Sequence, residues 1–141
     1  MTSLITILAG VSVFVISQYF LRLVLDPITR VRRAVADVSS TVLFRQARIS
    51  NATHDNDVAE ELRRVSSQLH GSISEVRGYP FWFVLALFGI PSKSDARNGC
   101  RCLNLMAGNA SSPDKDRHQL VEWNAKALDD LARFLNIETR Y

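Results

Sequence analysis

The sequence predicts an all-α protein: one N-terminal transmembrane helix followed by a four- to five-helix cytoplasmic bundle. Two observations predict this fold class. Residues 1–21 carry no charged side chain, and residues 22–48 hold six arginines against two acidic residues. In the rest of the 141-residue chain, apolar residues recur at helical spacing, and 11 basic residues nearly balance 12 acidic ones. An uncharged apolar run with a basic flank is typical of a membrane anchor, so we divide the chain into an anchor, residues 1–25, and a cytoplasmic helical bundle, residues 26–141.

The anchor is long enough to cross a bilayer. Residues 4–21 are eighteen positions without a formal charge, and including residues 23–25 the helix would extend about 33 Å at 1.5 Å per residue. A cleaved signal peptide is the alternative. Such a peptide normally starts with basic residues and ends in a small-residue cleavage site, and Ser17-Gln18-Tyr19 is a poor one. We therefore expect an uncleaved anchor.

The arginines after the anchor set the expected orientation. Cytoplasmic flanks of membrane helices carry an excess of Lys and Arg, so we expect a single pass through a bacterial inner membrane with the C-terminal domain cytoplasmic. Arg22 can extend along the helix to the headgroups. Three further arginines are expected to contact anionic lipid headgroups: Arg30, Arg32 and Arg33. RNA is the alternative partner of this basic stretch, but beside an anchor the lipid bilayer is favoured over nucleic acid.

Small and polar residues recur within the anchor. Thr2, Thr6 and Gly10 are spaced by four, and Ser17 and Gln18 lie toward the cytoplasmic end. Such residues let membrane helices pack closely and share hydrogen bonds, although they are also ordinary in single-pass helices. We expect a homo-oligomer, with membrane or oligomer contacts at Thr6, Gly10, Gln18, Arg22, Phe81 and Trp82.

The first helices of the bundle follow from capping and periodicity. Asp26-Pro27 favours a new or kinked helix, and Asp57-Val58-Ala59-Glu60 resembles the capping box of the next one. The first of these helices carries an apolar stripe that faces either the bundle itself or a coiled-coil partner: Ile28, Val31, Val35, Val38 and Val42.

The later helices are less uniform. Residues 81–90 are apolar but too few to span a bilayer, and they predict a short helix buried in the bundle or lying at the membrane face, with a re-entrant segment as the alternative. Asp95 and Ser112-Pro113-Asp114 predict the starts of two more helices. The last helix is expected to place five residues on its core face: Leu120, Ala127, Leu128, Leu131 and Leu135.

The sequence contains no familiar cofactor motif. It has no Walker loop, glycine-rich dinucleotide fingerprint, zinc-protease helix or paired CxxC, so we expect no cofactor and no metal. Cys100 and Cys102 are two positions apart, which on a helix directs their side chains about 200° away from each other. We expect two reduced, buried or half-buried thiols.

One pair of residues has the chemistry to act on phosphate. Arg63 lies seven residues before His70, so the two share a helix face about two turns apart. Histidine moves protons near neutral pH, and arginine holds phosphate with a bidentate fork. Arg63 and His70 are therefore the candidate catalytic residues, with an exposed arginine and histidine of no catalytic role as the alternative. Arg48 and His54 give a similar spacing.

The chain also resembles known families. Arginine and histidine at this kind of spacing resemble the signature of RNases of the HEPN superfamily, whose helical domains dimerise around an RNA phosphate. The stretches Gln18-Tyr19-Phe20-Leu21-Arg22 and Glu61-Leu62-Arg63-Arg64 resemble uncharacterised bacterial single-pass membrane proteins of similar length. The layout, one membrane helix before a small HEPN-like bundle, is similar to that of the membrane accessory proteins of RNA-targeting CRISPR systems. That resemblance implies a protein that oligomerises in antiviral defence, with a pore-like assembly as one form of the oligomer.

The function that these observations favour is non-enzymatic. We expect an inner-membrane protein that assembles with itself or with a protein partner, as an accessory or effector in antiviral defence. A membrane-tethered HEPN-like RNase using Arg63 and His70 is one alternative, and a signalling or sensing subunit is another.

Overall fold

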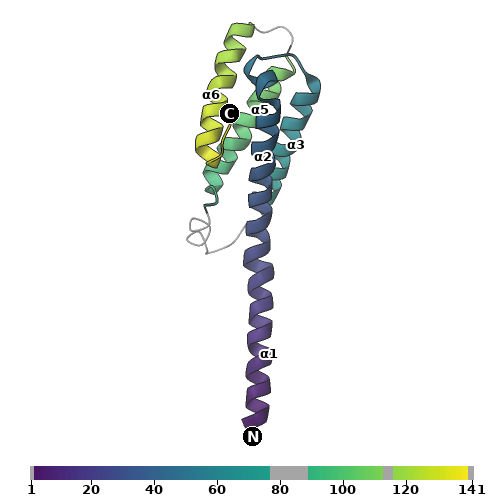
Figure 1. Ribbon diagram of the computed structural model, residues 1–141, viewed down its shortest axis with the longest axis vertical. Helices are drawn as coiled ribbons and strands as arrows, with labels where there is room; N and C mark the ends of the chain where they lie inside the picture. The colour runs from purple at the N-terminus through teal and green to yellow at the C-terminus, as the bar shows by residue number, and fades with distance from the viewer. Residues whose placement is uncertain (1, 77–88, 113–115, 140–141) are drawn as a thin grey trace.

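The computed structural model describes residues 2–76, 89–112 and 116–139, and every regular element in these ranges is a helix (Figure 1). Three segments, α1 (Thr2–Phe20), η1 (Leu21–Leu25) and α2 (Asp26–Ser50), form one continuous helix. Three more helices follow: α3 (Asn56–Glu75), α5 (Lys93–Ala110) and α6 (Arg117–Leu135). The all-α prediction is confirmed for the described part of the chain.

The two halves of the long helix have opposite surroundings. Residues 4–23 are all exposed, and Figure 1 shows α1 extending away from the other helices. In α2, by contrast, one stripe is buried: Ile28, Val31, Ala34, Val38, Thr41, Val42 and Ile49. This stripe packs into the core of the same chain, as the intramolecular alternative predicted.

α2 begins at Asp26 with Pro27 in its first turn, as predicted, but it is not a separate helix, because the chain stays helical through η1 into α2. Leu25, at the N-cap position of α2, has helical backbone angles and makes no side-chain cap. Proline lacks an N–H and in an α-helix its ring would clash with the carbonyl four residues back. Here the preceding turn is π-helical, and the Asp26 N–H reaches back to the Leu21 carbonyl. The wider turn accommodates Pro27 without ending the helix.

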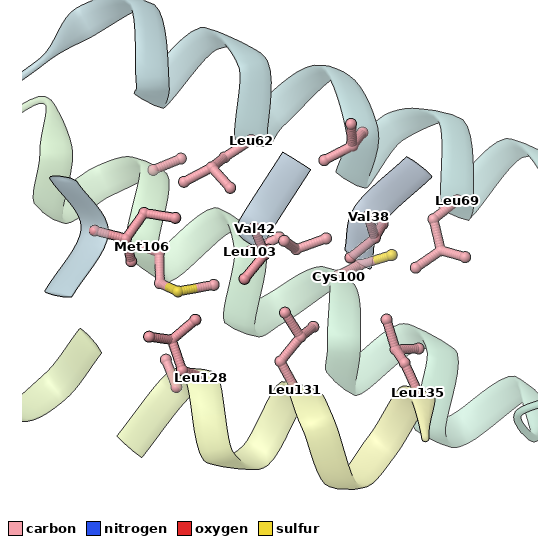
Figure 2. Close-up of a cluster of buried hydrophobic side chains, with 14 of the residues drawn as sticks. Val38, Val42, Leu62, Leu69, Cys100, Leu103, Met106, Leu128, Leu131 and Leu135 are labelled. Atoms are coloured by element: carbon pink, nitrogen blue, oxygen red, sulfur yellow. The ribbon is translucent and has the colours of Figure 1, made fainter. Parts of the chain in front are cut away.

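The core of the bundle lies between α2, α3, α5 and α6, so the second half of the long helix forms one wall and the three following helices form the others (Figure 2). Its largest fully buried side chains are Leu62, Leu69, Leu103, Met106, Leu128, Leu131, Leu135, Val31, Val38, Val42, Val58 and Val65. All five predicted core residues of the last helix are buried. Of the short helix predicted over residues 81–90, residues 81–88 lie outside the described residues.

The N-caps differ from those predicted. α3 is capped by Asp55, whose carboxylate accepts the N–H groups of Asp57 and Val58 at 3.0 and 3.2 Å. Asp57 is therefore not the cap but a residue of the first turn. The cap is displaced because Asp55 has an extended backbone, with φ −153° and ψ 104°, which aims its carboxylate at the free amides of the first turn.

The two later helices also start at other residues. α5 is capped by Ser92, whose hydroxyl accepts the Asp95 N–H at 3.1 Å and donates to the Asp95 carboxylate at 2.6 Å. Asp95 thus supports the cap from within the helix. α6 is capped by Asp116, and the predicted start at Ser112-Pro113-Asp114 falls partly on residues 113–115, outside the described ranges.

Candidate functional site

The most conspicuous feature of the described surface is the apolar N-terminal half of the long helix. Thirteen large hydrophobic side chains between Leu4 and Leu23 are exposed, from 44% for Val15 to 72% for Leu4. The continuous helix has one window long and apolar enough to cross a membrane. The amino-acid sequence alone accounts for this surface, because a helix with an uncharged apolar run of this length presents apolar side chains on every side.

The two serine hydroxyls of this segment are satisfied within it. The Ser12 and Ser17 hydroxyls donate to the Leu8 and Val13 carbonyls, four residues back, at 2.9 and 2.8 Å. Thr6 is also engaged in an interaction. Hydroxyls paired in this way can enter hydrocarbon without a partner from outside the helix.

Gln18 and Gly10 differ from these hydroxyls. The Gln18 amide is exposed and makes no hydrogen bond with the residues that the structure describes. The Gln18 side chain lines an open hollow of about 610 Å³. The other lining residues are Phe14, Val15, Tyr19 and Arg22, which lies one turn after Gln18. At Gly10, a Cβ atom would meet nothing within 4 Å, so this side of the helix is open to the close approach of another backbone.

The predicted headgroup arginines lie beyond the end of the apolar segment. Arg30 Nη1 contacts Glu75 Oε2 of α3 at 2.7 Å, with both side chains more than half exposed. Arg32 is engaged in an interaction, and Arg33 is exposed. At 1.5 Å per residue, these three positions are about 7.5 to 12 Å past Leu25.

The candidate catalytic pair, Arg63 and His70, meets opposite ends of α5. Arg63 Nη2 donates to Ser111 Oγ at 3.1 Å, just after the end of α5. His70 lines a pocket with Lys93 and Arg97, at the start of α5. The two positions are about 10.5 Å apart along the α3 axis, and their side chains lie at different ends of α5, so they do not form one site.

The pocket beside His70 contains functional candidates that sequence reasoning missed. Its volume is about 170 Å³, and its lining combines two helices: His70, Ile73 and Ser74 from α3 with Lys93 and Arg97 from α5. Lys93 and Arg97 are four positions apart at the start of a helix, where basic residues are unfavourable. Two basic residues at the start of a helix were the one sign in the sequence of a site here. Their closeness to His70 could not be predicted, because it depends on the antiparallel packing of α3 on α5.

The two cysteines pack as small side chains. Cys100 is buried and its Sγ donates to the Ser66 carbonyl at 3.5 Å, while Ser66 Oγ donates to the Cys100 carbonyl at 3.3 Å. Burial raises the pKa of both the Cys100 and Cys102 thiols, which keeps them protonated and poorly nucleophilic. Within the described residues, no three His, Cys, Asp or Glu side chains gather into a metal site.

The remaining predicted contacts, Phe81 and Trp82, lie outside the described residues. Comparison with known proteins adds no relative, because no family model, curated protein or solved structure matches this chain.

Proposed function

We propose that this protein crosses a membrane once through α1 and η1, holds its helical bundle at the cytoplasmic face, and assembles with further copies of itself through the anchor. One observation carries the proposal: residues 4–23 form an apolar helix whose side chains are all exposed outside the core.

The cost of leaving this helix in water argues for a membrane. Burying one large apolar side chain is worth about 1.5 to 3 kcal/mol, so the thirteen exposed side chains represent roughly 20 kcal/mol or more. That exceeds the total stability of a typical domain, about 5 to 15 kcal/mol. A bilayer removes the whole surface from water at once.

The dimensions of the helix agree with this placement. Residues 2–21 extend about 30 Å, which matches the roughly 30 Å of hydrocarbon in a bilayer. Arg22 would then stand at the hydrocarbon boundary. Arg30 is eight residues, or about 12 Å, past Arg22, so its backbone would lie beyond the headgroup layer, which is about 5 to 7.5 Å thick on each side, and its long side chain would reach back toward the headgroups.

Self-assembly is supported by Gln18. An amide at the hydrocarbon boundary needs a hydrogen-bonding partner, and the described residues provide none. The same residue on a second anchor would supply both a donor and an acceptor, and Gly10 leaves its side of the helix open. A copy of this chain is therefore the partner we propose.

Membrane insertion is tested by carbonate extraction of Val13→Arg. An arginine at the centre of a membrane helix costs about 2.5 to 3.5 kcal/mol, so the variant should move from the membrane pellet to the soluble or degraded fraction. Val121→Arg, at a 38% exposed valine of α6, is the matched control and should stay in the pellet. Soluble wild-type protein, or an intact mass that lacks the first residues after cleavage of a signal peptide, would contradict the anchor.

Self-assembly is tested by the mass of the detergent-solubilised protein. The wild type should be oligomeric, and Gln18→Leu should shift the population toward monomer because it removes the interhelical hydrogen bond, worth about 0.6 to 2 kcal/mol. Ile16→Leu, a volume-conserving change two positions away, should leave the mass unchanged. A wild type that is monomeric at every protein concentration would contradict self-assembly and leave membrane insertion intact.

A further inference from the structure

Three basic side chains from two helices face one pocket. His70 comes from α3, near its C-terminal end, and Lys93 and Arg97 come from the first turns of α5. Ile73 and Ser74 complete the lining. The Ser74 hydroxyl donates to the His70 carbonyl at 2.8 Å, which fixes its oxygen beside the pocket as a further polar group.

Among the described residues, no carboxylate lines the pocket beside this cluster. The two carboxylates nearest in sequence contact other groups. Glu75 contacts Arg30 at 2.7 Å, and the Asp95 carboxylate accepts the Ser92 hydroxyl at 2.6 Å. Residues 77–88, which connect toward α5, contain Arg77 as their only charged residue, so they add no negative charge either.

The direction of α5 adds to the positive potential. The N-terminus of a helix carries about half a positive charge, and Lys93 is the first residue of this 18-residue helix. The helix dipole repels a lysine at this position, whereas an anion is attracted by the dipole and by the lysine. Concentrating like charges around a hollow is unfavourable unless a ligand of opposite charge occupies it.

We propose that this pocket binds a phosphate-bearing anion through Lys93, Arg97 and His70. Its volume of about 170 Å³ equals that of about six water molecules, which suits one or two phosphoryl groups. Arginine offers planar paired donors to phosphate oxygens, lysine offers a compact charge, and histidine offers a ring N–H. The ligand is either a free phosphate compound or a lipid headgroup with an exposed phosphate. The proposal does not depend on α1 crossing a membrane.

The test is calorimetric titration of the detergent-solubilised full chain, at constant ionic strength, with two probes. Inorganic pyrophosphate represents a free ligand, and a short-chain phosphatidic acid represents a headgroup. We expect saturable binding of at least one probe, weakened about tenfold or more in the double variant Lys93→Gln/Arg97→Gln, because the variant removes two positively charged hydrogen-bond donors from the pocket. Lys126→Gln, which removes an exposed positive charge on α6, is the control and should bind like the wild type.

Each result has a defined meaning. Pyrophosphate binding alone identifies a free phosphate compound as the ligand class, and phosphatidic acid binding alone identifies a headgroup. The absence of saturable binding of either probe would overturn the proposal. So would a Lys126→Gln variant that weakens binding as much as the double variant does, because the net charge of the protein alone would then explain the attraction. Lys93 and Arg97 are exposed, and an unchanged melting temperature of the double variant will show that lost binding is not lost folding.

Discussion

Asp55 connects three helices at the end of the bundle far from the anchor. Its carboxylate caps α3 through the amides of Asp57 and Val58 and forms an ion pair with Arg48 of α2. Its own N–H donates to the Ala110 carbonyl, the last residue of α5, at 3.0 Å. One residue thus stabilises the start of a helix and holds it against two others.

The charge of Asp55 should make stability depend on pH. The Val58 amide and then Arg48 hold the pKa of the Asp55 carboxyl below its ordinary value of 3.8, against the opposing effect of burial. Because the unfolded chain takes up this proton at a higher pH than the folded one, the stabilisation is fully present above about pH 4 and is lost as pH falls through the lowered pKa.

We therefore expect the urea unfolding free energy of the wild type to fall more steeply below about pH 4 than that of Asp55→Asn. Arg48→Gln should show an intermediate slope, since the Val58 amide still stabilises the carboxylate. Equal slopes for the wild type and Asp55→Asn would show that this carboxylate does not contribute.

Single-residue details were the least predictable from the sequence. The apolar spacing of α6 predicts its core face, yet Asn124 lies on that face and is buried. Its side chain donates to the Ile49 carbonyl and accepts from Asn109, both at 2.8 Å. A buried amide pair of this kind depends on which helices meet, and periodicity within one helix carries no information about that. The same limit applies to Lys93 and Arg97 beside His70.

At the scale of helices, Gly99 sets how closely α5 approaches α6. A Cβ atom at this position would lie 2.9 Å from Leu135 Cδ2 and 3.0 Å from its Cγ. Leu135 is a core residue, 2% exposed, with little freedom to move. The close contact therefore requires a residue without a side chain.

Gly99→Ala and Gly108→Ala should change stability in opposite directions. At Gly99 the overpacking cost, about 1 to 3 kcal/mol, exceeds the helix-propensity gain of about 0.5 to 1 kcal/mol. At Gly108, on the same helix, a Cβ meets nothing within 4 Å, so only the gain remains. Urea unfolding of both variants measures this, and a stabilised Gly99→Ala protein would contradict the packing described.

Periodicity predicted the helices well and their junctions poorly. The buried stripe of α2 and the core face of α6 follow from residue spacing, because burial of apolar groups dominates folding energetics. The start of α2 at Asp26-Pro27 was predicted, but the π turn before it, which lets the helix continue past the proline, was not. Such a turn depends on backbone adjustment that residue type alone does not indicate.

For the whole molecule, the bundle should fold without the anchor. Residues 4–23 contribute no buried side chain, and the first buried core residue is Ile28. A chain of residues 26–141 should therefore unfold cooperatively, with a melting temperature within about 4 °C of the full chain, the shift that 1 kcal/mol produces in a domain of this size. Circular dichroism during heating checks this, and a broad, non-cooperative transition would show that the anchor supports the fold.

Because the helix continues without a break from α1 to α2, a change in the tilt of α1 moves the far end of α2. Membrane helices tilt by about 20° on average, and α2 continues for 25 residues beyond the π turn, or about 37 Å. A change of tilt by that angle would sweep the far end of α2 sideways by about 13 Å. With α1 and η1 crossing a membrane as proposed above, a change in bilayer thickness would therefore displace the bundle by a large distance over the membrane surface.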